Sequence, residues 1–316
     1  MEESNPSTQN KSTETKTEKH MENSKETAEV PLTSQDEATK ANSEAPANSL
    51  ERATLLFGKD AIDTLESKTV VVAGCGGVGS FAIEALARSG VGRLVLIDKD
   101  VVEASNLNRQ LCALTSTVGQ AKTEILKERI ARIRPQTEVI AYTGWYDKQL
   151  NDWLLEQKPD YVLDCIDSMR SKQDLILFAL DNQIPVISSM GMARRKDPTK
   201  IEIMELEKTT NDPMAKVMRN WKRKNRIRKK IMTVCSTELP IPMEPGKSLP
   251  SAIFVPASAG LAMASYCVQD LMNPKPEKKT DFSIQPEPMD PAEMVNRMTE
   301  KVNTMTEMVN TKGETK

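Results

Sequence analysis

Short apolar runs alternate with amphipathic segments through the middle of this chain. The runs are continuous and rich in β-branched residues, as buried parallel strands are, and the segments between them repeat apolar residues at helical spacing. This alternation predicts an α/β fold of the Rossmann-like, doubly wound kind, with a mostly parallel sheet and helices on both faces. The predicted strands are residues 69–73, 93–97, 138–142, 161–167 and 185–189, and the predicted helices are 78–88, 122–133, 148–156 and 170–182.

Composition divides the chain into one domain and two tails. Residues 1–48 hold almost no apolar residue, so we expect a disordered, acidic N-terminal tail. Residues 273–316 are also expected to be largely disordered, with one short helix at 291–309, where methionine and valine recur at helical spacing. The working domain is therefore predicted at 49–272.

Two features bear on the compartment. The apolar stretch 252–272 is interrupted by Pro256, Gly260 and Asp270, so it predicts a core helix and not a membrane span of ~20 apolar residues. Five scattered cysteines without a CxxC pair describe neither a disulfide framework nor a structural zinc site. With no apolar leader at the start, we expect a cytoplasmic protein that does not associate with membranes.

The most informative motif follows the first predicted strand and reads Gly74-Cys75-Gly76-Gly77-Val78-Gly79-Ser80. Glycines at such a turn let the backbone approach a phosphate, and the N-terminus of the following helix attracts the anion. Asp98 ends the next strand, where folds of this kind hold a ribose hydroxyl. The pattern alone fits NAD, FAD or ATP.

Polar residues near the carboxyl ends of the strands favour ATP. Arg109 and Lys122 would screen phosphate oxygens, and Asp167 would hold Mg²⁺. A dehydrogenase usually needs a general acid or base, yet the only histidine, His20, lies in the predicted N-terminal tail. The ATP site is therefore expected at the carboxyl edge of the sheet.

Charge is concentrated in one segment. The whole chain carries a net charge of −2, but residues 216–230 contain nine bases and no acid. Such a run suits a polyanion, because each neutralised phosphate releases counterions, and Trp221 offers a stacking face for an unpaired base. The alternatives are a solvated helix face or a targeting signal. Trp145 and Trp153 are expected in the core. The predicted nucleic-acid contacts are Arg219, Trp221, Lys222, Arg223, Arg226 and Arg228.

Five motifs in fixed order resemble those of the ThiF/MoeB/ubiquitin-activating superfamily of ATP-dependent adenylyltransferases. Within it, residues 51–272 most resemble the tRNA threonylcarbamoyladenosine dehydratases of the TcdA or CsdL type. The sulfur-carrier adenylyltransferases resemble the chain less, because they usually carry two CxxC zinc pairs. The five motifs are the glycine-rich loop, Asp98-Lys99-Asp100, Asn106-Leu107-Asn108-Arg109-Gln110, Gly119-Gln120-Ala121-Lys122 and Asp164-Cys165-Ile166-Asp167-Ser168.

The resemblance implies an enzyme that uses ATP and Mg²⁺ on a tRNA substrate. It would adenylate the threonyl carboxylate of threonylcarbamoyladenosine, and the neighbouring carbamoyl group would then close a ring, with overall loss of water. The basic run lies where the resemblance places a tRNA contact. One rival is activation of a ubiquitin-like or sulfur-carrier protein at its C-terminus, and a more distant one is an NAD-dependent oxidoreductase. An RNA-binding module without enzymatic activity would leave the ATP motifs unexplained.

The resemblance also implies roles for residues. Arg52 matches an arginine that enters the neighbouring subunit's site, which implies a homodimer, and whether a sulfur-relay protein binds is left open. Cys235 falls where relatives form a thioester, but ring closure needs no covalent intermediate, so an essential nucleophile is not expected there. The implied nucleotide site consists of Gly74, Gly76, Gly77, Gly79, Asp98, Asp100, Asn106, Arg109 and Lys122. Arg52, Arg109, Lys122 and the Mg²⁺ ligand Asp167 are the implied catalytic residues.

Overall fold

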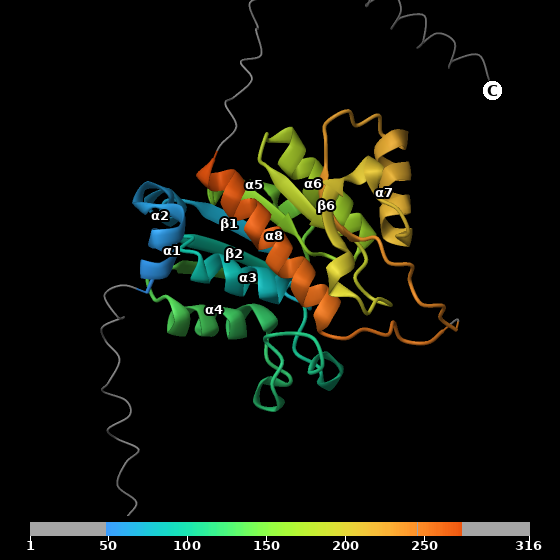
Figure 1. Ribbon diagram of the computed structural model, residues 1–316, viewed down its shortest axis with the longest axis horizontal. Helices are drawn as coiled ribbons and strands as arrows, with labels where there is room; N and C mark the ends of the chain where they lie inside the picture. Colours follow the sequence, from blue (N-terminus) through green and yellow to red (C-terminus); the bar gives the residue numbers. More distant parts are fainter. Residues whose placement is uncertain (1–48, 245, 274–316) are drawn as a thin grey trace, which may run out of the picture. The chain divides into compact units, whose positions relative to one another are not determined.

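The computed structural model of the protein describes residues 49–244 and 246–273 (Figure 1). The predicted N-terminal tail, 1–48, and the predicted helix at 291–309 lie outside the described residues. Both therefore stay predictions.

A seven-stranded sheet forms the centre of the described residues, in the order β3-β2-β1-β4-β5-β7-β6. Every neighbouring pair is parallel except β6 and β7, which are antiparallel. The mostly parallel, Rossmann-like sheet is thus confirmed. The strands are β1 (Thr69–Ala73), β2 (Arg93–Asp98), β3 (Glu138–Thr143), β4 (Tyr161–Asp164), β5 (Val186–Ser189), β6 (Ile201–Glu205) and β7 (Met232–Ser236).

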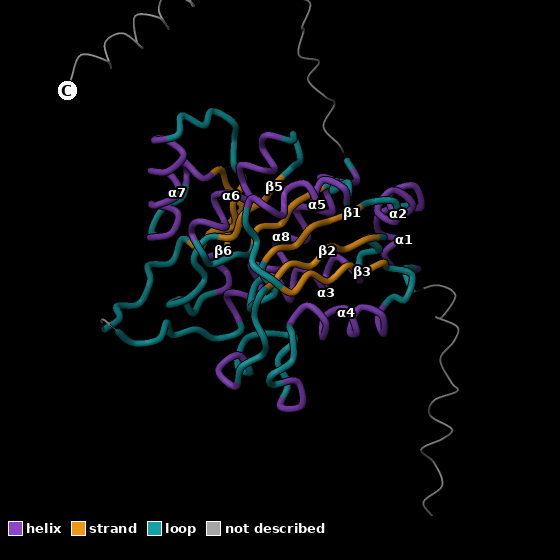
Figure 2. The backbone as a smooth tube through the Cα atoms, turned by 180° about the vertical axis from the view of Figure 1, so that it is seen from behind, coloured by secondary structure: helices purple, strands orange, loops and turns teal. Residues whose placement is uncertain are grey.

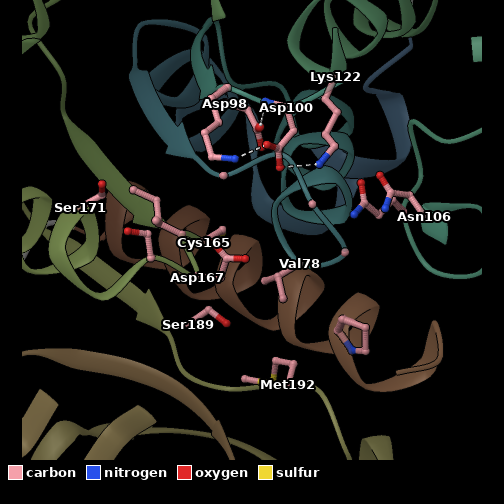
Figure 3. Close-up of a pocket in the computed structure, with 18 of the residues that line it drawn as sticks. Val78, Asp98, Asp100, Asn106, Lys122, Cys165, Asp167, Ser171, Ser189 and Met192 are labelled. Atoms are coloured by element: carbon pink, nitrogen blue, oxygen red, sulfur yellow. Dashed lines mark hydrogen bonds and ion pairs between the residues drawn. The ribbon is translucent and has the colours of Figure 1, made fainter. Parts of the chain in front are cut away.

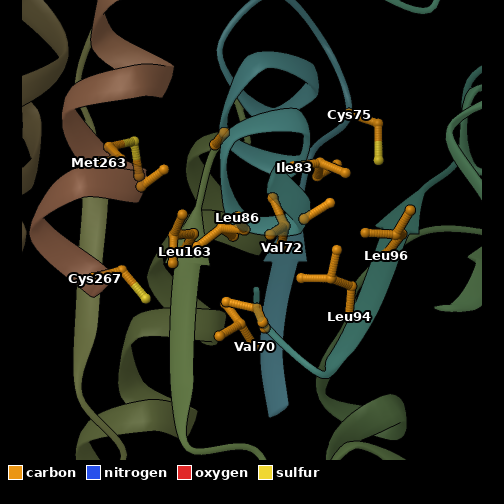
Figure 4. Packing of buried hydrophobic residues seen from close by; sticks show 14 of the residues in the cluster. Val70, Val72, Cys75, Ile83, Leu86, Leu94, Leu96, Leu163, Met263 and Cys267 are labelled. Atoms are coloured by element: carbon orange, nitrogen blue, oxygen red, sulfur yellow. The ribbon is translucent and has the colours of Figure 1, made fainter. Parts of the chain in front are cut away.

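Helices cover both faces of this sheet, as the backbone trace in Figure 2 shows. Side chains alternate along each strand, so β1 sends Val70 and Val72 into one apolar core and Val71 and Ala73 into a second. In Figure 4 the first core lies between the strands and α3 and α8, with Val72 beside Leu86. This face carries α1 (Glu51–Phe57), α2 (Lys59–Glu66), α3 (Gly79–Arg88), α4 (Lys122–Ile133) and α8 (Phe254–Met272), and the other carries α5 (Asn151–Glu156), α6 (Met169–Asp181) and α7 (Pro213–Lys224).

The sheet reverses its winding at β1, which is flanked by β2 on one side and β4 on the other. The connections that leave β1 and β4 therefore run to opposite sides, and a crevice opens between them at the carboxyl edge. Helix α8, predicted as a core helix, closes this crevice from one face. A Cβ at Gly260 would lie 2.2 Å from the carbonyl oxygen of Val78, so only glycine lets α8 approach the start of α3 this closely.

The structure differs from the expected elements in three places. The strand predicted at 161–167 ends at Asp164, and residues 165–168 form the loop that carries Asp167. The edge strand β6 and its neighbour β7 were not expected, because neither is a continuous apolar run. Part of the basic run is the helix α7, whose N-cap Asp212 accepts a hydrogen bond from the backbone amide of Ala215 at 2.8 Å.

No helix of the described residues is long and apolar enough to cross a bilayer.

Candidate active site

A cavity of about 540 Å³ opens at the carboxyl edge of the sheet, above β1, β2, β4 and β5. The glycine-rich loop and the polar residues predicted from the sequence converge on it, although they come from segments far apart in the chain. Its predicted lining residues are Gly74, Gly76, Gly77, Asp98, Asp100, Asn106, Arg109, Lys122 and Asp167.

The glycine-rich loop forms the floor of the cavity at the start of α3. Gly74 has a φ of +91°, and a Cβ there would lie 2.5 Å from the carbonyl oxygen of Cys165. The N-cap of α3, Val78, makes no side-chain capping bond, and the amide of Ser80 donates to the carbonyl oxygen of Gly76 at 3.0 Å. An uncapped helix N-terminus at a cavity is suited to an anion such as a phosphate.

Gly79 has a different part from the one expected, because it does not line the cavity. A Cβ at this position would lie 1.7 Å from the carbonyl oxygen of Gly74, far inside contact distance. Gly79 therefore allows α3 to pack directly against the end of β1. Its contribution to a nucleotide site is to hold the loop in place.

The end of β2 supplies two carboxylates to one side of the cavity (Figure 3). Asp98 accepts hydrogen bonds from the backbone amides of Cys75 at 2.5 Å and Asp100 at 2.8 Å. Each of its oxygens keeps a further lone pair for a hydroxyl group. Burial opposes ionisation of Asp100, but the hydrogen bonds from Lys99 and Lys122 outweigh this effect, so the pKa of Asp100 lies below its ordinary value.

Two cations and an amide face the same cavity from the connection after β2. Lys122, the first residue of α4, is buried, and its Nζ lies 3.0 Å from Oδ2 of Asp100. Arg109 donates from Nη1 to the carbonyl oxygen of Ser105 at 2.7 Å and to Oδ1 of Asn108 at 3.0 Å. The buried Asn106 accepts from the backbone amide of Glu103 at 3.2 Å. These bonds hold Lys122, Arg109 and Asn106 in the wall of the cavity.

Asp167 lies across the cavity from Asp98 and Asp100, in the loop after β4 (Figure 3). It is exposed, and no hydrogen bond or ion pair of the described residues engages its carboxylate. A pair beneath it fixes the base of this loop, because Nζ of the fully buried Lys172 lies 2.7 Å from Oδ2 of Asp164. Lys172 also donates to the carbonyl oxygen of Ser189 at 2.9 Å, which ties the ends of β4 and β5 together.

Arg52 lies apart from the cavity. It is exposed on α1, which follows Leu50, and Leu50 packs against Gly90 just ahead of β2. This is the amino edge of the sheet, whereas the cavity is at the carboxyl edge. Arg52 therefore cannot belong to the site of its own subunit.

The basic run divides into structural and exposed residues, which corrects part of the expectation for residues 216–230. Lys222 is buried in an ion pair with Glu207, and Arg219 donates to the carbonyl oxygen of Thr209 at 2.8 Å. Trp221 is partly buried against the second core, so its ring is engaged in packing. The members of the run left exposed without an ion pair within the described residues are Lys216, Arg223, Lys224, Arg226, Arg228 and Lys229.

Cys235 is a core residue of β7. Its side chain is fully buried, and burial raises the pKa of the thiol to about 12. The thiol is therefore protonated at neutral pH, which argues against a nucleophile at this position.

Sequence reasoning missed part of the cavity lining. Trp145, expected in the core, is 57% exposed and lines the cavity beside Lys99. The loop after β5, from Ser189 to Ala193, forms another wall. This wall could have been predicted, because residues that follow a parallel strand lie at the carboxyl edge and a strand was predicted at 185–189.

Comparison with known proteins assigns the chain to a family. The sequence profile of the ThiF family matches residues 50–301, so the chain belongs to the ThiF family. It is 45% identical over 231 residues to the tRNA threonylcarbamoyladenosine dehydratase of Bacillus subtilis, which covers 68% of this chain and 91% of that protein.

Solved structures agree with this similarity. The fold is similar to E. coli tRNA N6-threonylcarbamoyladenosine dehydratase, TcdA, in complex with AMP, with a TM-score of 0.67, 35% identity and coverage of 70% of this chain and 93% of that chain. The same enzyme in complex with ATP gives a TM-score of 0.67 at 34% identity, covering 71% and 94%. The resemblance stated from the sequence motifs is therefore confirmed.

Proposed function

We propose that the chain is an ATP-dependent tRNA threonylcarbamoyladenosine dehydratase. One observation carries the proposal: the five sequence motifs meet around a single cavity that joins the start of α3 with three cations and four carboxylates. The similarity to dehydratases over most of their length supports the same substrate.

In this proposal the cavity binds ATP through complementary charge. The glycine-rich loop ahead of α3 faces the phosphates, and Lys122 and Arg109 neutralise their oxygens. Asp98 accepts hydrogen bonds from the ribose hydroxyls. Because Lys122 is buried, its attraction to a phosphate is weakly screened by water.

Asp167 is the residue suited to Mg²⁺. Its carboxylate is exposed to the cavity without a protein partner among the described residues, and Mg²⁺ is usually held by one or two carboxylates together with phosphate oxygens and water. When bound, the ion would neutralise charge on the phosphates. The Lys172–Asp164 pair would hold the Asp167 loop in the position that this role needs.

The chemistry takes place in two steps with balanced atoms. A carboxylate oxygen of the threonyl group attacks the α-phosphorus of ATP, which forms an acyl-adenylate and releases pyrophosphate. The neighbouring carbamoyl group then attacks the acyl carbon, AMP leaves with that carboxylate oxygen, and a proton is lost. Intramolecular attack can lower the barrier by ~7–11 kcal/mol when the groups are aligned, so the protein's main tasks are to position the substrate and to stabilise charge on the phosphates.

The exposed bases of the run at 216–230 are the proposed tRNA contact. They lie on α7 and the segment after it, and α7 reaches the cavity through Met214 near its N-terminus. The buried Arg195 links the two regions, since it donates to Oδ2 of the N-cap Asp212 at 3.1 Å and to the carbonyl oxygen of Gly191, which lines the cavity. A phosphate backbone on α7 would thus lie along a path that leads to the site.

Homodimer formation is part of the proposal, with Arg52 acting in the site of a second subunit. Helix α1 has no buried residue, and it exposes Leu55 at 82% and Leu56 at 75%. Apolar side chains exposed in this way beside a cation favour a helix that docks on another copy. We also propose a cytoplasmic enzyme, because all five cysteine thiols are unpaired.

The decisive test combines the protein with ATP, Mg²⁺ and tRNA that carries threonylcarbamoyladenosine. The nucleoside recovered from the tRNA should lose the mass of one water, and only when ATP is present. An unchanged nucleoside, together with pyrophosphate exchange that depends on a carrier protein, would instead favour activation of a ubiquitin-like or sulfur-carrier protein.

A further inference from the structure

Trp145 is placed unusually for a tryptophan. It follows β3 by two residues and lines the cavity, yet 57% of its surface is exposed. Trp153, by contrast, is partly buried, and its ring packs against Tyr142 with centroids 5.3 Å apart. An exposed indole on a cavity wall can offer a face to a flat ligand.

The position of Trp145 relative to the rest of the site is fixed by the backbone. The amide of Gly144 donates to the carbonyl oxygen of Asp98 at 3.0 Å, so the loop that carries Trp145 starts beside the end of β2. On the other side of Asp98, the amide of Gly74 donates to the carbonyl oxygen of Ile97 at 2.7 Å. The glycine-rich loop, Asp98 and Trp145 therefore follow one another along the carboxyl edge, over β1, β2 and β3.

This order gives a direction to a bound nucleotide. The phosphates belong over β1 at the start of α3, and the ribose belongs at Asp98 over β2. The base, which is attached on the far side of the ribose, then lies over β3. Trp145 is the exposed aromatic residue at that place.

A cation holds the indole from one side. Nζ of Lys99 lies 4.5 Å from the centroid of the Trp145 ring, and it also pairs with Asp100. The hydrogen bond to Asp100 raises the pKa of Lys99, so this cation is charged at neutral pH. Lys99 covers one face of the ring, and the exposure of Trp145 leaves the other face for a stacked base.

We propose that Trp145, oriented by Lys99, is the platform on which the adenine of ATP stacks. This inference rests on the proposed ATP-dependent function and adds to it the residue that recognises the base. Trp145 is a binding residue, and it takes no part in proton or adenylyl transfer.

The test measures binding of ATP and of tripolyphosphate to the full chain by calorimetry, without tRNA. Loss of base stacking in Trp145→Ala should raise the Kd for ATP about tenfold. Trp145→Phe keeps an aromatic ring, so its Kd for ATP should stay within about threefold of wild type. The Kd for tripolyphosphate should be unchanged in both variants, since it has no base to stack. Trp153→Phe, which alters a packed tryptophan, is the matched control and should bind ATP as wild type does.

Fluorescence gives a second readout, because the chain has three tryptophans. Saturating ATP should quench part of the emission in wild type and in Trp153→Phe, and this quenching should disappear in Trp145→Phe. An unchanged Kd for ATP in Trp145→Ala would overturn the proposal, and so would an equal loss of tripolyphosphate binding. Quenching of Trp145 by the modified tRNA and not by ATP would also contradict it, because the platform would then serve the RNA base.

Failure of the proposed function gives a different result. In that case ATP would bind with the predicted dependence on Trp145, but the tRNA would lose no water.

Discussion

The buried pair of Lys172 and Asp164 allows a quantitative prediction of stability. Both side chains are fully buried, and Lys172 is held by Asp164 at 2.7 Å, the carbonyl oxygen of Ser189 at 2.9 Å and the hydroxyl of Ser188 at 3.3 Å. Lys172→Met removes the cation and leaves the Asp164 carboxylate buried with only Ser188 and the amide of Ile166 as hydrogen-bond donors. An uncompensated buried charge of this kind costs about 3–5 kcal/mol.

Urea unfolding followed by circular dichroism measures the free energy of unfolding, which should fall by about 3–5 kcal/mol in Lys172→Met. At roughly 2–4 °C per kcal/mol for a domain of this size, the same change should lower Tm by about 10 °C. The control is Lys148→Met, because the Lys148 ammonium lies 3.4 Å from Oδ1 of Asp174 but is 66% exposed. An exposed pair contributes about 0–1 kcal/mol, so this variant should remain close to wild type.

A double-mutant cycle separates the pair from simple loss of packing. Asp164→Asn alone should also be strongly destabilising, because it leaves the buried ammonium without its carboxylate. The double variant should lose at least about 2 kcal/mol less than the sum of the two single variants. Additive losses, or a cost for Lys172→Met as small as that of Lys148→Met, would show that the buried pair does not stabilise the fold in this way.

The remaining predictions concern the site and its surroundings. Cys235→Ala should keep at least about a third of wild-type turnover, and loss of turnover would indicate a covalent role. Iodoacetamide should label Cys235 of the folded protein only slowly at pH 8, because burial raises the pKa of the thiol to about 12. Charge reversal of Arg223, Arg226 and Arg228 should weaken tRNA binding and make its affinity less dependent on salt concentration. Lys127→Glu on α4 should change neither the affinity nor its salt dependence. An unchanged salt dependence in the triple variant would mean that these bases only face solvent. Arg52→Ala and Lys122→Met should each abolish turnover. When equal amounts of the two variants exchange subunits, half of the dimers are mixed and one of their two sites is intact, so about a quarter of wild-type activity should return. A mixture that stays inactive would exclude Arg52 from a partner's site.

The sequence predicted the central sheet well because its buried strands are continuous apolar runs. It did not predict β6, where Ile201, Ile203 and Glu205 lie at the sheet edge and an alternating polar pattern gives a weaker signal. A helix in the basic run was only an alternative, without bounds, although Asp212 and Pro213 form a recognisable start.

The site was predicted unevenly for a similar reason. The glycine-rich loop and Asp98 follow strands directly, so their place at the carboxyl edge can be read from the chain. The ion pair of the buried Lys222 with Glu207 and the contact of the exposed Trp145 with Lys99 each join residues that are distant in sequence. Residue type alone therefore suggested a surface cation and a core aromatic, and both expectations were wrong.

Adenylation of the substrate determines where one of its oxygen atoms goes. If the carboxylate of threonylcarbamoyladenosine is adenylated in this cavity, an ¹⁸O label placed in that carboxylate must leave with AMP when the ring closes. We predict that mass spectrometry finds one labelled oxygen in the AMP released by the wild-type protein. Unlabelled AMP, formed while the tRNA loses water, would show that the carboxylate is not adenylated.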